Sequence, residues 1–114
     1  MLTDYVKSQK DNIKKFLSSL DIDISAIQNE ELMLQSFVHK SYAADYMEPL
    51  VDNERLEYLW DSILGCVIAI EMFNTFPEYG EDKLTLYKIA LVREETLAIA
   101  ANDIKLQDHI FISK

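Results

Sequence analysis

A helix-length apolar stripe between Asn53 and Thr75 constrains the fold of this chain more than any other feature of its sequence. Apolar residues recur there at the spacing of one helix face, at Leu56, Leu59, Ile63, Val67, Ile70 and Phe73. Between Ile63 and Ile70 the helix is apolar all round. Such a helix is expected to be buried on most sides. The sequence therefore predicts a central buried helix over residues 53–75.

The remaining segments also favour helices. Two glycines and two prolines are too few for a sandwich or barrel, which needs a turn signal every ~8–12 residues. Thr3 is placed to cap a first helix that reaches Leu20, and Asn29 a second that ends near Val38. Residues 39–52 are expected to be mostly loop, broken at Pro49. Helical stripes resume at Leu84 and Leu97, so the sequence predicts an all-α fold and a single domain over residues 1–114.

Several classes of protein are disfavoured by the composition. The single cysteine, Cys66, excludes an internal disulfide and a cysteine-rich zinc site, and its apolar surroundings predict a core residue. Charged residues such as Asp4 and Lys7 interrupt the start of the chain, where a signal peptide would be apolar. The longest uncharged run, Ser62 to Ile70, is far short of the ~20 residues that span a bilayer. We expect a cytoplasmic protein that does not enter membranes.

The formal net charge is −9. By itself this charge argues against nucleic-acid binding, which usually needs a basic surface. It is compatible with a protein that collects divalent cations.

Three carboxylates stand at the start of the apolar stripe. Glu54, Glu57 and Asp61 are three and four residues apart, so they share one helix face. Like charges at this spacing repel, and a bound magnesium ion, which prefers carboxylate and water ligands, would remove the repulsion. Two alternatives stay open at this point: acidic residues also favour the positive end of a helix dipole, and Arg55 could pair with a neighbouring carboxylate.

A resemblance to a known family gives these carboxylates a more specific interpretation. The string NERLEYLWDSILG, residues 53–65, resembles the signature of the ribonuclease III family, N-E-R-L-E-F-L-G-D-[AS]-[IV]-L-G. The string FVHKSY, residues 37–42, resembles the family's F-T-H-[RK]-S-Y element. Phe76-Pro77, Glu81, Leu84-Thr85 and Leu91-Val92 are similar to a third stretch, F-P…E-G-x-[LM]-[ST]…L-V. The resemblance covers about residues 30–112.

The resemblance implies an all-helical homodimer that hydrolyses double-stranded RNA with Mg²⁺, or Mn²⁺ in its place, and leaves short 3′ overhangs. It implies that Glu57 and Asp61 are metal-binding and catalytic. Glu54 and Glu81 match acidic positions that assist catalysis or the dimer contact. Lys88 stands where many members have arginine.

Two further groups of residues are candidates for partner contacts. Lys40 and Lys88 could meet the RNA phosphates, with metal ions bridging. Tyr58, Leu59 and Trp60 give the helix apolar residues on more than one side, which favours a dimer interface. The alternative is that these three side chains fill the core of the monomer.

The sequence departs from the family pattern at two points. Trp60 stands where the signature has glycine, so its ring could displace Asp61 or could occupy room made by neighbouring changes. The family's two remaining metal ligands lie beyond the point that matches Lys114, as does the usual double-stranded RNA-binding domain. We therefore expect a catalytic domain truncated on its C-terminal side.

Three hypotheses follow from the sequence. The first is a ribonuclease III present as a fragment or as one piece of a split enzyme. The second is a non-catalytic relative, a scaffold or an RNA-binding and dimerisation subunit. The third is a shortened or engineered variant. The intact acids at positions 54, 57, 61 and 81 favour the first.

Overall fold

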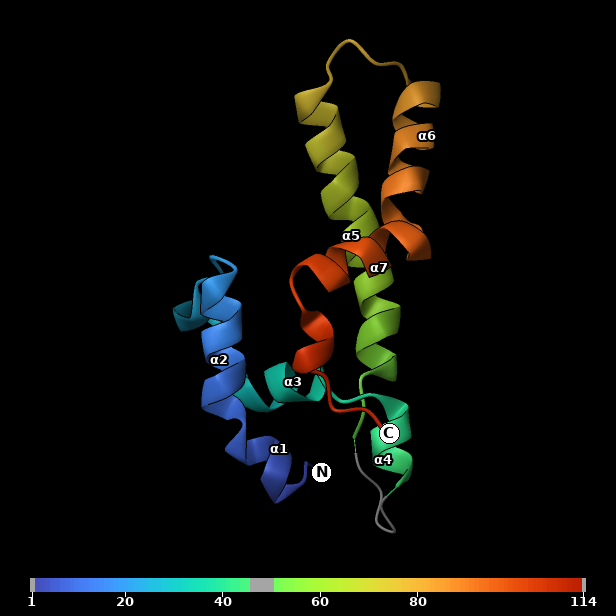
Figure 1. Cartoon of the computed structure of the whole chain (residues 1–114). Helices are drawn as coiled ribbons and strands as arrows, with labels where there is room; N and C mark the ends of the chain where they lie inside the picture. Colours follow the sequence, from blue (N-terminus) through green and yellow to red (C-terminus); the bar gives the residue numbers. More distant parts are fainter. Residues whose placement is uncertain (1, 46–50, 114) are drawn as a thin grey trace. The chain divides into compact units, whose positions relative to one another are not determined.

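A computed structural model describes residues 2–45 and 51–113. In these two ranges the regular secondary structure is helical (Figure 1), apart from one isolated parallel bridge between Val38 and Phe111. The helices are α1 (Asp4–Ser8), α2 (Lys10–Ser19), α3 (Glu30–Gln35), α4 (Lys40–Ala44), α5 (Glu54–Thr75), α6 (Glu81–Val92) and α7 (Glu94–Asp103), with short 3₁₀ turns η1 (Ile24–Ala26) and η2 (Leu106–Asp108). The all-α prediction and the span of the long helix are confirmed.

The chain packs as two compact units. Unit 1 comprises Met1–Leu56 and Lys105–Lys114, and unit 2 comprises Glu57–Ile104. That residues 1–114 form a single catalytic domain stays a prediction.

Unit 1 contains a hydrophobic core built from α1, α2, α3 and the C-terminal segment. Its buried members are Leu2, Val6, Ile13, Phe16, Leu34, Phe37, Val38 and Phe111. The Phe16 ring lies edge-on to Phe37, with centroids 6.3 Å apart, and stacks on His109 at 3.9 Å. Residues from both ends of the sequence therefore close one core.

The caps predicted for unit 1 are confirmed. The Thr3 hydroxyl accepts a hydrogen bond from the Val6 N–H at 3.2 Å, and Asn29 Oδ1 accepts one from the Leu32 N–H at 3.0 Å. Each cap satisfies a backbone donor that the first helical turn leaves free.

The helix boundaries predicted between these caps and residue 52 need correction. The first helix is broken at Gln9. The second ends at Gln35, since the Phe37 carbonyl and the His39 N–H both bond to Phe111 at 2.9 Å. The predicted loop after it contains α4, which His39 caps by accepting from the Ser41 N–H at 3.1 Å. Pro49 lies outside the described residues.

An ion-pair cluster joins α2 to the first turn of α3. The Glu30 carboxylate accepts hydrogen bonds from the ammonium groups of Lys14 and Lys10, the latter at 3.0 Å. These bonds hold the pKa of Glu30 below its ordinary value, since they favour the ionised carboxylate.

Unit 2 contains α5 from Glu57 onward, paired with α6 in a hairpin, and then α7 (Figure 1). In α5 the one buried residue is Met72. Leu59, Ile63, Val67 and Ile70 are exposed on the face opposite Met72, and the lone Cys66 is exposed beside them. The predictions of a buried α5 and a buried Cys66 are therefore wrong for this chain by itself, because no described helix of unit 2 covers that face.

None of the helices in the described ranges is both long and apolar enough to cross a membrane.

Candidate functional site

The carboxylate-bearing helix α5 begins at a backbone segment that α3 holds in place. The Gln35 side-chain amide donates to the Asp52 carbonyl at 2.8 Å. The Asn53 N–H donates to the Val38 carbonyl at 2.9 Å, and the Asn53 side-chain amide donates to the Ser36 carbonyl at 3.0 Å. We call these three contacts the α3–α5 hydrogen bonds. No local sequence pattern indicates these contacts, because the two side-chain bonds join residues 17 positions apart.

The first acidic residue of the candidate site, Glu54, lies in the first turn of α5 in unit 1. Its N–H donates to the Asp52 carboxylate at 3.0 Å, which satisfies one of the free donors of that turn. Its own carboxylate lies 3.5 Å from the Lys40 ammonium, and both side chains are mostly exposed. An exposed pair of this kind contributes only ~0–1 kcal/mol. The structure thus brings a predicted RNA contact, Lys40, beside a predicted catalytic acid.

Glu57 and Asp61 lie one helical turn apart on α5, in unit 2. Both are exposed, and neither side chain bonds or ion-pairs with another described residue. Arg55, a possible partner in the sequence, makes no ion pair within the described part of the chain either. Two unpaired carboxylates at this spacing repel each other, and nothing in the described residues offsets the repulsion.

This donor set fits a magnesium ion in part. Mg²⁺ usually keeps several waters and binds through one or two carboxylates together with substrate phosphates. Glu57 and Asp61 supply such a pair, and their exposure leaves room for water and phosphate. Over residues 2–45 and 51–113, no three His, Cys, Asp or Glu residues gather into a fuller cluster.

The structure places Glu81 apart from this pair. Glu81 lies in the first turn of α6 and lines a cavity of about 510 Å³ with Met72, Phe73 and Lys88, among others. Met72 is about 16 Å along α5 from Asp61, or three helical turns. Within unit 2, Glu81 therefore does not join the two carboxylates.

Lys88 lies nearer to the carboxylates than Glu81 does. A Cβ atom added at Gly65 would be 3.6 Å from Lys88 Cε, so the lysine side chain extends across α5 one turn after Asp61. Lys88 makes no ion pair among the described residues. Its ammonium is therefore available to a phosphate.

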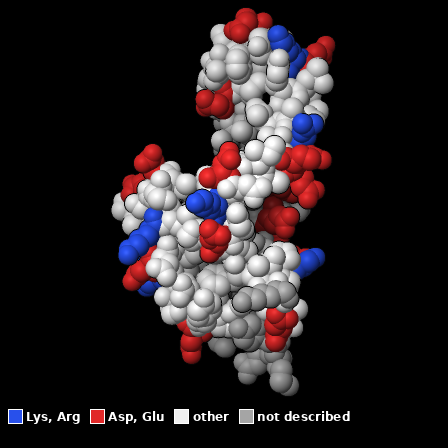
Figure 2. All heavy atoms as spheres, viewed as in Figure 1, with Lys and Arg blue, Asp and Glu red and all other residues white. Residues whose placement is uncertain are grey.

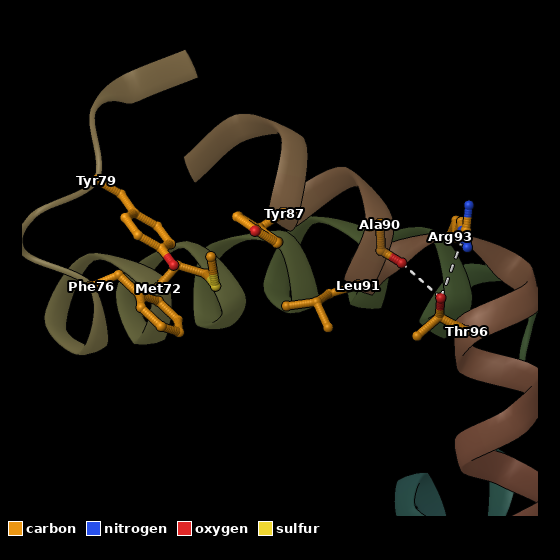
Figure 3. Close-up of a pocket in the computed structure, with 8 residues that line it drawn as sticks. All are labelled: Met72, Phe76, Tyr79, Tyr87, Ala90, Leu91, Arg93 and Thr96. Atoms are coloured by element: carbon orange, nitrogen blue, oxygen red, sulfur yellow. Dashed lines mark hydrogen bonds between the residues drawn. The ribbon is translucent and has the colours of Figure 1, made fainter. Parts of the chain in front are cut away.

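A second cavity in unit 2 was not expected from the sequence. Its volume is about 460 Å³, and it is lined by Met72, Phe76, Tyr79, Tyr87, Ala90, Leu91, Arg93 and Thr96 (Figure 3). The Tyr79 ring stacks on Phe76 at 4.7 Å and on Tyr87 at 5.6 Å. The aromatic residues in and beside the turn at residues 77–80 are the only signal in the sequence that could have indicated this cavity.

The predicted interface residues are all exposed. Tyr58 is 81% exposed, Leu59 53% and Trp60 52%. They do not fill the core of unit 2, so that alternative is wrong for this chain. The α5 helix continues through both Trp60 and Asp61, so the large side chain at position 60 does not interrupt the helix that carries Asp61.

The charged side chains of the chain are predominantly acidic. The chain has 20 acidic and 11 basic side chains, and Figure 2 shows several separate groups of acidic atoms on the visible face. A polyanion would therefore meet local cations such as Lys40 and Lys88, not a broad basic surface.

The signature, the exposed carboxylate pair and the helical fold agree with a family comparison. The sequence model of the Ribonuclease-III-like family matches residues 29–114. The chain belongs to this family.

Two ribonuclease 3 proteins illustrate the similarity: one from Borreliella burgdorferi is 32% identical over 106 residues, and one from Staphylococcus saprophyticus is 33% identical over 112. These matches cover 93% and 97% of this chain but 42% and 45% of the two proteins. The chain thus spans less than half the length of these ribonuclease III relatives.

Solved structures support the same family. Two solved structures of the nuclease domain of ribonuclease III from Campylobacter jejuni match this chain, each with a TM-score of 0.71 and 32% identity. The matches cover 89% and 90% of this chain and 65% and 64% of the two solved chains. One of these structures is described as flexible in a region involved in dimer formation.

Proposed function

We propose that this ribonuclease III-like chain carries part of the catalytic centre of an endoribonuclease that cleaves double-stranded RNA for RNA processing. The observation that carries the proposal is the pair Glu57 and Asp61, which lie one turn apart, exposed and unpaired, inside the family signature. A functional pair of ligands accounts for a repulsion that a purely structural helix would have no reason to keep.

The proposed chemistry is phosphodiester hydrolysis. Bound Mg²⁺, or Mn²⁺ in its place, would activate water and stabilise charge on the departing oxygen. Glu57 and Asp61 would hold the ion through their carboxylate oxygens. Glu54, one turn before Glu57, would accept hydrogen bonds from metal-bound or attacking water. A role for Glu81 in catalysis or in the dimer contact stays a prediction.

The proposed contacts to RNA are Lys40 and Lys88. Lys88 makes no ion pair among the described residues, and Lys40 is held only by the exposed contact to Glu54. Exchanging that contact for a phosphate costs little, since an exposed pair contributes only ~0–1 kcal/mol. Because the net charge of the chain is acidic, RNA phosphates would bind only where a metal ion and a lysine act together.

We also propose that the protein acts as a homodimer in the cytoplasm, as one catalytic domain. The exposed Tyr58, Leu59 and Trp60 support the dimer, because large aromatic and aliphatic side chains exposed together mark interaction surfaces. A solved relative has a region involved in dimer formation.

Replacing Leu59 by glutamate is expected to convert a dimer into a monomer. The change places a charge within the proposed apolar interface, where it would have to be desolvated. Sedimentation equilibrium over a range of concentrations measures the result. Ile112→Glu is the matched control, because Ile112 is equally exposed, at 53%, but is not one of the proposed interface residues. Equal dimer dissociation constants for the two variants would contradict the proposed interface.

Cleavage of labelled RNA tests the proposed activity. We expect the protein to cut a duplex in Mg²⁺, to leave the separated single strands intact, and to stop when the metal is chelated. Products are sized on a denaturing gel. Equal cutting of duplex and single strands, or cutting that survives chelation, would contradict the proposal.

A non-catalytic scaffold is the second candidate. The observation that favours it is the lack of any cluster of three or more possible metal ligands in the part of the chain that the structure describes. Specific binding of duplex RNA without cleavage, unaffected by Mg²⁺, would support this candidate over the nuclease.

A further inference from the structure

The cavity drawn in Figure 3 has two chemically different ends, and all the residues that line it belong to unit 2. Phe76 and Tyr79 lie at one end, Arg93 and Thr96 lie at the other, and Leu91 adds an apolar wall between them (Figure 3). The volume of about 460 Å³ falls within the range of ~300–1,000 Å³ that small-molecule sites occupy. A ligand that uses the whole cavity must combine an apolar part with a polar end.

The apolar end is a stack of three aromatic rings. The planes of Phe76 and Tyr79 differ by 3°, and those of Tyr79 and Tyr87 differ by 18°. The Lys83 ammonium lies 3.9 Å from the centre of the Tyr79 ring and helps to hold it. Tyr87 ends the stack and is 46% exposed, so its ring is accessible to a ligand. Such a platform accepts a planar ring, and stacking of this kind tolerates any nucleobase.

The polar end is formed by Arg93 and Thr96. Arg93 Nε donates to Thr96 Oγ1 at 3.4 Å, and Thr96 Oγ1 donates to the Ala90 carbonyl at 2.7 Å. The terminal nitrogens of Arg93 bond to no other described residue, and Arg93 makes no ion pair in the described ranges. Of the described residues that line the cavity, Arg93 alone carries a charge. Its planar fork matches the oxygens of a phosphate group.

We propose that this cavity binds a single nucleotide, with its base against Tyr87 and its phosphate at Arg93. These two residues are six positions apart, or about 9 Å along the helix, a separation that one nucleotide and the arginine side chain can bridge. A purely apolar ligand would leave Arg93 unpaired, and a simple anion would leave the aromatic end empty. The inference goes beyond the proposed function, since it requires neither a metal ion nor cleavage.

The test is a titration with adenosine 5′-monophosphate in the presence of a metal chelator, followed by the NMR shifts of the backbone amides. The chelator prevents the phosphate from binding through a metal at Glu57 and Asp61, so a failure of the proposed metal site leaves this result unchanged. We expect saturable binding, with the largest shifts between residues 76 and 96. Adenosine and ribose 5-phosphate should each bind about 10-fold more weakly. Equal affinities for the nucleotide and inorganic phosphate, or no saturation up to about 10 mM, would overturn the proposal.

Two substitutions separate the two ends of the cavity. Tyr87→Leu keeps an apolar side chain but removes the ring, and Arg93→Gln removes the charge. Each should weaken nucleotide binding about 10-fold. Phe73→Leu is the control for the first, because Phe73 is an exposed aromatic residue of the same unit that does not line this cavity. Arg55→Gln, which removes the other arginine of the chain, is the control for the second. Affinities of the two variants within twofold of their controls would refute the site.

A free nucleotide and an unpaired residue of an RNA strand present the same chemistry to this cavity. Competition between adenosine 5′-monophosphate and a single-stranded adenosine trinucleotide distinguishes the two sources. Displacement of the mononucleotide by an equal or lower concentration of the trinucleotide supports an RNA strand as the ligand. Displacement by mononucleotides alone supports a free nucleotide.

Discussion

Replacing Asp61 by asparagine is expected to reduce Mg²⁺-dependent cleavage of duplex RNA by at least about 100-fold, since even a small misplacement at a reacting centre costs that much. The amide keeps the size of the side chain but removes half of the carboxylate pair that would hold the ion. Glu57→Gln should have a comparable effect. The rate is measured under single-turnover conditions, so that product release does not mask the change.

The same substitution should not destabilise the protein. Glu57 and Asp61 repel each other one turn apart, and removing such a repulsion stabilises a helix by ~0.2–0.5 kcal/mol. The unfolding midpoint without metal should therefore stay the same or rise. Asp103→Asn is the control, because Asp103 is an exposed acid in α7 of the same unit. An equal loss of cleavage in this control, or a large loss of stability in Asp61→Asn, would show that the effect does not arise at the proposed site.

Truncation of Phe16 to alanine is expected to lower the free energy of unfolding by ~3–5 kcal/mol, the usual cost of removing a buried phenylalanine ring. Phe16 is 7% exposed, and its ring contacts Phe37 and His109, which belong to distant segments. A domain is commonly stable by only ~5–15 kcal/mol, so this loss would remove a large fraction of the stability.

Urea unfolding followed by circular dichroism measures the effect of Phe16→Ala. Leu32→Ala provides the comparison, because Leu32 is an exposed residue of α3 in the same unit. We expect a change below ~0.5 kcal/mol there. Similar losses in the two variants would mean that the core of unit 1 is not organised around Phe16.

The features that the sequence predicted correctly are local ones. The caps at Thr3 and Asn29 depend on residues three positions away, and the span of α5 follows from a continuous apolar stripe. The family signature also lies within one uninterrupted segment, residues 53–65. Each of these signals can be recognised without knowing how distant segments pack.

The errors concern distant contacts. The second helix ends early because Phe37 and His39 pair with Phe111. A stripe shows that a helix has an apolar face but not what covers it, so the burial of Ile63 and Val67 was predicted wrongly. The α3–α5 hydrogen bonds join segments that no periodicity relates.

In the candidate site, too, the local features were predicted correctly and the distant contacts were not. Spacing alone placed Glu54, Glu57 and Asp61 on one helix. It could not show that Lys40 lies beside Glu54, or that Glu81 shares a cavity with Met72, which is about three turns along α5 from Asp61. Trp60, which suggested a blocked site, is half exposed in a regular helix.

The most direct test of the metal site is a titration of the protein with Mn²⁺, read by the loss of the free-ion electron paramagnetic resonance signal. The proposed site predicts specific binding to the wild-type chain, competition by Mg²⁺, and an affinity at least about 10-fold lower for Asp61→Asn. Asp103→Asn should bind as the wild type does. Binding that is identical in wild type and Asp61→Asn would contradict the claim that Glu57 and Asp61 form a metal site.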